Sequence, residues 1–410
     1  MSREHDRYKR FTRVLLWLGV ALLGLDGGVR YLLLRTAEGT DLSRIVRRQQ
    51  QTGATYLSLL NDNEFEYKVE LVEQRRPVVI ALGSSSVLQF REEFFDASFV
   101  NAGRAVTRMD EAPDFLHALE PDRLPEVMLL GIDFWEFHSS KVPSAAYDPT
   151  REGEAIVSLD KIRLLYSHWT QDRVPVRDML GKVVFGEEPP RNRPFAFRSM
   201  GLSALAGFHG FRPDGSFFYG DLVVGRQRRF DDREFRETLN GIDRGDDRWQ
   251  HGDAISETAW TMLTEVVETA EAQGVHVIVF MPPVAPSVIE KLQEEGERYR
   301  YLDILRRRLA SRDRSHDYLD PRVVNATDCE FIDGFHGGDV VFQRILLDLA
   351  KQDEVLRPFV DVTELRRSIH MNRGRTLTPF TRVETSPGFE ETDFLGIGCD
   401  KRPAGHEVPR

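Results

Sequence analysis

The sequence predicts an α/β protein with a parallel sheet, preceded by one N-terminal transmembrane helix. Short apolar runs are typical of strands that are buried on both faces of a parallel sheet. Before the last run, residues at helical spacing indicate a helix over 255–274, which Gly274 closes. The order of helix, glycine and strand is typical of an α/β domain. The expected strands lie within 77–82, 98–103, 126–137 and 275–283, and a last helix is expected over 337–351.

Composition narrows the functional classes. The 410 residues are 41% hydrophobic and 10% aromatic, which fits a packed globular core. The formal net charge is −11, and this excess of acid argues against a nucleic-acid partner.

The first 35 residues carry the clearest local signal. An apolar stretch over 14–34 is about 30 Å long as a helix, enough to cross a bilayer. No convincing cleavage site follows, so we expect an uncleaved signal-anchor and a single-pass protein of the cell inner membrane. A buried N-terminal helix of a soluble protein is the alternative. Basic residues before the apolar stretch predict a cytoplasmic N-terminus and a periplasmic main domain: Arg3, Arg7, Lys9, Arg10 and Arg13.

Further along, the chain divides into a helical neck at 36–74, a main domain at 75–356 and a C-terminal tail at 357–410 that lacks clear periodicity. The main domain carries an insertion at about 140–253 that does not alternate helix and strand. Its part rich in Phe, Gly and Arg, 193–222, has two interpretations. It is either a set of surface loops with a small aromatic core of their own, or a lid or sugar-binding wall, since aromatic faces and arginine suit acidic carbohydrates.

Two cysteines occur, Cys329 and Cys399, and no C-x-x-C motif is present. A structural zinc site is therefore not expected, and we expect no metal or other cofactor. Two unpaired thiols are the default expectation, although an oxidising compartment would permit one disulfide.

Two motifs suggest chemistry. Ser84, Ser85 and Ser86 follow the first strand and its glycine, and Asp333 and His336 form a D-x-x-H motif just before the last helix. A histidine is a ready general base, and a carboxylate on its other nitrogen fixes the tautomer. Both motifs should lie at the carboxyl edge of the parallel sheet, where such folds place their sites. Ser84 and Ser86 have a sufficient explanation as turn and cap residues.

In this order, the motifs resemble those of the SGNH (GDSL-type) hydrolase superfamily, and especially its membrane-anchored branch of AlgX/AlgJ-like and DltD-like acyltransferases. Gly83-Ser84-Ser85 resembles the first block, Gly103 the second, and Asp333 with His336 the last. The third block, G-x-N-D in the family, is matched by Gly131-Ile132-Asp133, which lacks the asparagine. The resemblance implies a three-layer, flavodoxin-like fold.

The resemblance also implies roles. Ser85 would be the nucleophile, His336 the base and Asp333 its orienting carboxylate, with the amides of Ser85 and Gly103 holding the oxyanion. An ionised Asp133 cannot donate a hydrogen bond. Either Asp133 orients another group, or Asn101 supplies the donor, or the site handles its acyl group differently, or Asp133 is a structural residue that accepts from backbone amides.

The implied function is transfer of an O-acyl group, with acetyl expected, to an extracytoplasmic polysaccharide, and the implied partner is a multi-span membrane acyltransferase. A deacetylase or esterase, or an inactive polysaccharide-binding scaffold, are the alternatives.

Overall fold

The computed structural model describes residues 2–141, 159–171, 199–226, 232–381, 384–385 and 388–402. At its centre is a five-stranded sheet, here called the main sheet, in the order β3-β2-β4-β8-β9. Its strands pair in parallel, which confirms the predicted α/β class. The strands are β2 (Val79–Gly83), β3 (Phe99–Gly103), β4 (Val127–Gly131), β8 (His276–Met281) and β9 (Ser315–Asp317).

Four of these strands lie where the apolar runs predicted them, with two differences in detail. β4 ends at Gly131, earlier than expected, because the chain turns at Asp133 into a short 3-10 helix, η5 (Phe134–Phe137). β9 was not predicted. Its sequence, Ser-His-Asp, is polar and half-buried, as expected of a strand at the sheet edge with no apolar run to mark it.

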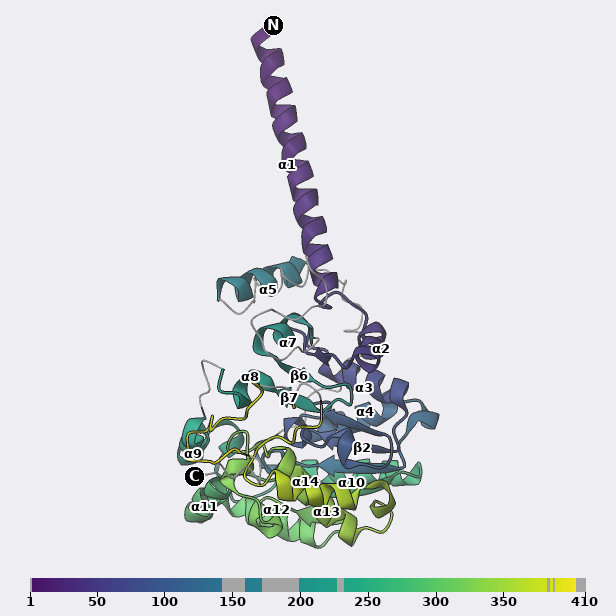
Figure 1. The fold of residues 1–410 in the computed structure, drawn as a ribbon, viewed down its shortest axis with the longest axis vertical. Helices are drawn as coiled ribbons and strands as arrows, with labels where there is room; N and C mark the ends of the chain where they lie inside the picture. The colour runs from purple at the N-terminus through teal and green to yellow at the C-terminus, as the bar shows by residue number, and fades with distance from the viewer. Residues whose placement is uncertain are drawn as a thin grey trace.

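Helices cover the main sheet. α4 contacts both α3 and α10, and α13 packs against α14. Figure 1 shows α12, α13 and α14 at the end of the molecule farthest from the N-terminus. The helices of this unit are α3 (Glu64–Arg75), α4 (Ala112–Ala118), α10 (Glu257–Ala272), α11 (Pro286–Glu294), α12 (Arg300–Ala310), α13 (Asp339–Gln352) and α14 (Val362–Met371).

The predicted helix over 255–274 is confirmed as α10. The Ser256 side chain caps its start by accepting a hydrogen bond from the Ala259 amide. Just past its end, Gly274 adopts a φ of 89°, which an L side chain rarely adopts.

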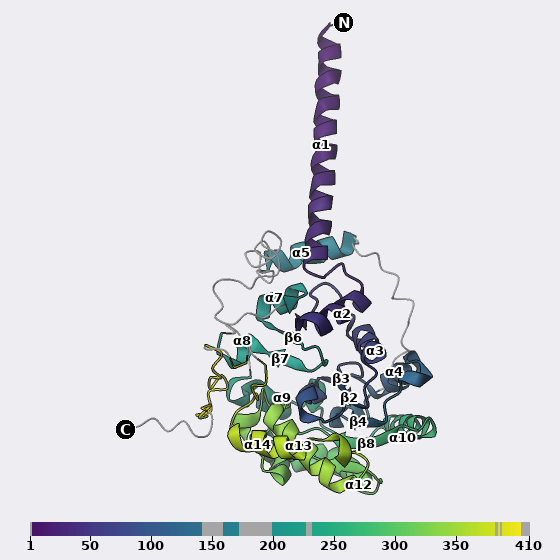
Figure 2. The same cartoon turned by 45° about the vertical axis from the view of Figure 1, so that its right-hand side comes forward.

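α1 (Ser2–Arg35) is one long helix that projects from the rest of the protein (Figures 1 and 2). Its segment Arg7–Arg35 is long and apolar enough to cross a membrane, and its most apolar window is not buried inside the protein. Asp26 and Arg30 form a salt bridge on its surface, with Arg30 Nε 2.8 Å from Asp26 Oδ2. Only the foot of α1 enters the protein, where Leu33 is buried against Leu60, Leu202 and Leu205.

The predicted neck and insertion build one unit together. β1 of the neck pairs in parallel with β5 and antiparallel with β6 of the insertion. The resulting small sheet has the order β5-β1-β6-β7. The neck is therefore no separate helical stalk, and its last helix, α3, packs on β3 of the main sheet. The elements are α2 (Leu42–Thr52), β1 (Thr55–Tyr56), β5 (Ser199–Met200), α7 (Leu202–Gly207), β6 (His209–Phe211), β7 (Phe217–Tyr219), α8 (Gly220–Val223) and α9 (Arg236–Arg244).

A buried lysine joins the small sheet to the main sheet. Lys68 Nζ donates to the backbone carbonyls of Asn101 in β3, at 2.9 Å, and of Gly215 between β6 and β7, at 2.5 Å. It also lies 4.1 Å from the ring centroid of Phe211. Phe211 and its aromatic neighbours on β7 belong to the same continuous core as the main sheet. The aromatic part of the insertion thus does not form a separate core. Residues 142–158, 172–198 and 227–231 of the predicted insertion lie outside the described residues.

The C-terminal tail is part of the fold, although its sequence lacks periodicity. α14 packs on α13, and Glu384 accepts hydrogen bonds from the buried guanidinium of Arg91. Arg91 also pairs with buried Asp339, with Nη1 2.9 Å from Oδ2. The partners that order this tail come from distant parts of the chain, which a local pattern does not reveal.

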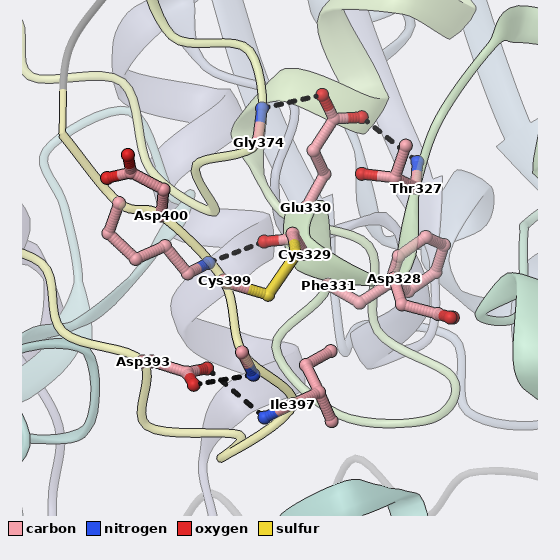
Figure 3. Close-up of a disulfide and its surroundings, with 12 residues drawn as sticks. Thr327, Asp328, Cys329, Glu330, Phe331, Gly374, Asp393, Ile397, Cys399 and Asp400 are labelled. Atoms are coloured by element: carbon pink, nitrogen blue, oxygen red, sulfur yellow. Dashed lines mark hydrogen bonds between the residues drawn. A yellow bond between two sulfur atoms is a disulfide. The ribbon is translucent and has the colours of Figure 1, made fainter.

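The two cysteines form a disulfide, which corrects the default expectation of unpaired thiols. The bond joins Cys399 of the tail to Cys329, which lies in the 3-10 helix η11 (Asp328–Glu330). Figure 3 shows the neighbouring Glu330 carboxylate between two segments, where it accepts hydrogen bonds from the amides of Thr327 and Gly374. The tail therefore holds the segment that leads directly into the D-x-x-H motif.

Candidate active site

The three residues expected to form a catalytic relay lie together. His336 Nε2 is 2.9 Å from Ser85 Oγ, and His336 Nδ1 is 2.7 Å from Asp333 Oδ2. Ser85 begins a short 3-10 helix, η1 (Ser85–Val87), directly after β2. Although 251 positions separate Ser85 from His336, the fold places them within hydrogen-bonding distance. The geometry is that of a serine whose hydroxyl proton can pass to an oriented imidazole.

The loop that carries Asp333 and His336 is held from several sides. Asp333 Oδ1 accepts hydrogen bonds from the backbone amides of Phe335 and His336. The Ile332 amide donates to the His336 carbonyl and closes the loop. From the insertion, Asp232 Oδ2 accepts from the Gly334 amide at 2.8 Å. These bonds fix the imidazole relative to the serine.

No family model, curated protein or solved structure matches this chain. The chemistry of the site is therefore argued from its own residues.

Asp333 is suited to remain a carboxylate. Burial by itself raises the pKa of Asp333, but the charge and hydrogen bond of His336, with the two backbone amides, outweigh it and lower the pKa below the usual value. An ionised Asp333 stabilises the imidazolium that forms when His336 takes the serine proton.

The serines on either side of Ser85 hold the turn, as the sequence predicted. Ser84 Oγ accepts from the Ser86 amide at 3.1 Å, and so caps the 3-10 helix. Ser86 Oγ lies 2.7 Å from Asp133 Oδ1 and donates to it. Both flanking serines are buried, whereas Ser85 is partly exposed. Asp133 thus holds the serine turn by accepting the hydrogen bond of the Ser86 hydroxyl, which is a structural contact.

Three glycines explain how the turn fits against the sheet. They are Gly83, Gly103 and Gly131, the last residues of β2, β3 and β4. A Cβ atom on Gly131 would lie 2.2 Å from a methyl group of Val87. The corresponding distance to a Val87 methyl group would be 3.0 Å from Gly103 and 3.1 Å from Gly83. Val87 therefore rests on the ends of three strands, and the glycines let the turn approach closely.

Two groups that were expected to donate to the oxyanion instead donate to other acceptors. The Gly103 amide donates to Asn101 Oδ1 at 2.8 Å. The Asn101 side-chain nitrogen donates to the carbonyls of Val87 and Phe90, both at 2.9 Å. Both groups are thus used in holding the serine turn. The Ser85 amide, the first of its 3-10 helix, has no acceptor among the described residues and remains the candidate donor.

An aromatic wall adjoins the relay; it consists of Trp135, Trp249 and Phe335. The Phe335 ring centroid lies 6.1 Å from that of Trp135 and 6.4 Å from that of Trp249. It lies 4.1 Å from that of His336. The Arg248 guanidinium stacks on Phe335, with 3.9 Å between its central carbon and the ring centroid. A cation and aromatic faces therefore lie beside the candidate nucleophile.

Sequence reasoning missed several residues of this site. Arg248, Trp249 and Asp232 come from the insertion, and Trp135 follows β4, but none of them stands in a motif. Tyr219 of β7 lies close enough for the Asp333 charge to contribute to its raised pKa, which burial mainly causes. The part of the insertion that the sequence singled out as a possible lid or wall, 193–222, does not contain the residues of this wall or Arg248, so the enrichment in Arg and aromatic residues did not identify them.

A metal site has no support in the described part of the chain. There, no group of three or more His, Cys, Asp and Glu side chains is arranged to hold an ion.

For Asp133→Asn, we expect a higher unfolding temperature at neutral pH and a smaller gain in acid. Burial raises the pKa of Asp133, and hydrogen bonds from Ser84 and Ser86 only partly oppose this. A group whose pKa is higher in the folded than in the unfolded state contributes its whole stabilising free energy below the unfolded-state pKa. This contribution is lost as the pH rises through the folded-state pKa. Asparagine does not ionise and can still accept the hydrogen bond from Ser86, so the variant does not lose this stability as the pH rises. Thermal unfolding from about pH 4 to 7 measures the difference.

If residue 133 faces the developing oxyanion, the same variant should raise ester hydrolysis by about tenfold, because an amide donor would replace a carboxylate that can only accept. A fall in activity with the fold intact would show instead that the carboxylate has a catalytic role of its own.

Proposed function

We propose that the protein is an SGNH-type acyltransferase that moves an O-acyl group, acetyl in the first instance, onto an extracytoplasmic polysaccharide. Ser85 attacks the acyl carbonyl while His336 Nε2 takes its proton. The donor's alcohol group leaves with that proton, and the acyl group stays on Ser85. A sugar hydroxyl then loses its proton to His336 and attacks the acyl-enzyme, which returns Ser85 to its starting state. Water in place of the sugar gives hydrolysis.

The observation that carries this proposal is the Ser85–His336–Asp333 relay, with distances of 2.9 and 2.7 Å. A structural hydroxyl would need only one fixed partner. Here the serine is partly exposed, the histidine is oriented by a carboxylate, and that carboxylate is held by backbone amides. Serine hydrolases on unrelated folds use this same set of roles.

The strand order supports the flavodoxin-like, three-layer arrangement of SGNH proteins. Numbered by their sequence in the main sheet, the strands run second, first, third, fourth, fifth. This is the flavodoxin-like order, and ligands of such sheets bind at the carboxyl ends of the strands, where the order reverses. Ser85 follows the first strand at that point.

Two features support a membrane-anchored, periplasmic location. α1 is long and apolar enough to span the inner membrane, and basic residues precede its apolar part. The Cys329–Cys399 disulfide supports an oxidising compartment for the main domain. An anchored enzyme of this kind could receive acyl groups from a multi-span membrane acyltransferase.

The test uses the full chain in detergent micelles with p-nitrophenyl acetate, and an acetyl-accepting oligosaccharide is then added. Release of p-nitrophenol with acetylation of the sugar supports transfer. Release with free acetate alone identifies an esterase or deacetylase. No release and no transfer, with the sugar still bound, would favour the inactive polysaccharide-binding scaffold.

Arg248 points to an acidic glycan as the acceptor. Its nearest ion-pair partner, Asp247, is an exposed side chain 3.7 Å from Arg248 Nε. The Arg248 side chain is 31% exposed, so its guanidinium is accessible to a carboxylate of a sugar that binds beside the aromatic wall.

We expect Arg248→Gln to raise KM for an acidic oligosaccharide by about ten- to a hundredfold, since a charge-assisted hydrogen bond contributes roughly 1.5–3 kcal/mol. Hydrolysis of p-nitrophenyl acetate, which is neutral, should be unchanged. Arg244→Gln, an exposed arginine of α9 paired with Asp246, is the matched control. Equal KM values for acidic and neutral oligosaccharides in both variants would contradict the assignment.

A further inference from the structure

α5 (Leu159–Thr170) is a helix of the insertion that exposes aromatic side chains. Tyr166 is 63% and Trp169 is 57% exposed, and their rings meet edge to face with centroids 6.1 Å apart. Three residues apart, Tyr166 and Trp169 lie on the same side of the helix. The surface of a soluble protein rarely exposes such an aromatic pair, so this side of α5 is a candidate interaction surface.

The position of α5 identifies what this surface contacts. Leu165 packs on the small cluster of Leu33, Leu60, Leu202 and Leu205, which holds the foot of α1. Figures 1 and 2 agree that α5 lies beside this foot and runs across the direction of α1. The exposed aromatic pair thus lies on the part of the protein nearest to the apolar span.

The apolar stretch of α1 gives the level of the membrane surface. It runs over 14–34 and ends one residue beyond Leu33 of the foot, and the exposed salt bridge of Asp26 with Arg30 lies in its outer part. From Arg30 to Leu33 the helix rises only about 4.5 Å. Through Leu165, α5 is therefore fixed close to the level where lipid headgroups would begin.

We propose that α5 is an interfacial helix that lies on the outer surface of the same membrane, with Tyr166 and Trp169 among the lipid headgroups. This inference rests on the anchoring of α1 in the proposed function. Tyr and Trp are enriched at membrane interfaces because one end of each side chain is apolar and the other polar. The basic Lys161 and Arg163 on α5 suit an anionic surface. α5 and α1 together fix the protein to the bilayer at two places.

The experiment places an environment-sensitive fluorophore on single cysteines of the full chain in phosphatidylcholine–phosphatidylglycerol vesicles. Both native cysteines are paired, so a new thiol alone reacts without reductant. The sites are Trp169→Cys on α5 and, as a matched control, Val323→Cys. Val323 is also an exposed apolar residue, 63% exposed, in the 3-10 helix η10 (Pro321–Val324), which packs on α13 at the far end of the molecule. Leu18→Cys within α1 reports insertion of the span.

Headgroup-level nitroxide lipids should quench the label at 169 at least about twofold more than the label at 323, and aqueous iodide should do the reverse. Equal quenching of both labels by iodide would overturn the proposal. Protection of the label at 169 from lipid and iodide alike would overturn it too, since a protein surface would then cover α5. An unquenched label at 18 would remove the anchor and the α5 assignment together. Esterase activity of the same vesicles tests the catalytic proposal independently.

Discussion

Ser85→Ala should abolish p-nitrophenyl acetate hydrolysis and acyl transfer, with a loss of about 10³-fold or more in kcat. Only one partly exposed hydroxyl is removed, so the variant should unfold at nearly the wild-type temperature. His336→Ala should cost about as much, because Ser85 Oγ and His336 Nε2 lie 2.9 Å apart and act as one unit. The double variant should therefore be scarcely worse than either single variant.

Neighbouring serines provide the controls for this experiment. Ser84→Ala removes the cap of the 3-10 helix and should cost about 1 kcal/mol of stability, with most activity retained. Ser86→Ala removes the hydroxyl that donates to Asp133, and it should affect stability more than the chemical step. Full activity of Ser85→Ala would contradict the proposed role of Ser85 as nucleophile and would favour a polysaccharide-binding scaffold.

Loss of the disulfide should produce the second large effect. In the double variant Cys329→Ser, Cys399→Ser, we expect the free energy of unfolding to fall by about 2–4 kcal/mol, because the bond closes a long loop with a sequence separation of 70. Activity should decline along with stability, since Cys329 lies four residues before Asp333. Denaturant unfolding and ester hydrolysis of the same preparations measure the two effects.

Reduction of the wild-type protein is the control for side-chain replacement, and it should reproduce the loss of stability. Production in a reducing cytoplasm should likewise give a less stable protein than export does. If the double variant were as stable as the wild type, the tail would be held by its other contacts, such as Glu384 with Arg91, and the disulfide would be dispensable.

Elements with a local signature were predictable from the sequence. The apolar runs of β2, β3, β4 and β8 and the spacing of α10 follow from burial on a sheet and on one helix face. The small sheet was not predictable, because Thr55–Tyr56 and Ser199–Met200 are two-residue strands that exist only as partners. The tail was also missed, since Arg91 and Cys329 hold it from far away in the chain.

The candidate site shows the same division. Ser85, Asp333 and His336 stand in short motifs at predictable ends of elements, and their meeting could be expected from parallel-sheet topology. Gly103 and Asn101 were assigned to the oxyanion by resemblance. Their hydrogen bonds instead hold the turn, a distinction that requires three-dimensional contacts. Arg248 and the aromatic wall depend on how the insertion folds back, for which no sequence period exists.

The small sheet between α1 and the main sheet would set the height of the main domain above the membrane in which α1 is proposed to lie. Only α2 separates its β1 from α1 in the sequence, and Lys68 joins its β6–β7 turn to β3 of the main sheet. In the proposed membrane-anchored state, the main domain is therefore held on α1 by folded structure, whereas a flexible linker would let it move through a wide volume. A rigidly held site has a high effective concentration of partners that lie at the same distance from the bilayer, and a very low one of partners at other distances. If the proposed glycan acceptor is correct, its distance from the membrane would thus limit which glycans reach Ser85, before any sugar contacts the site.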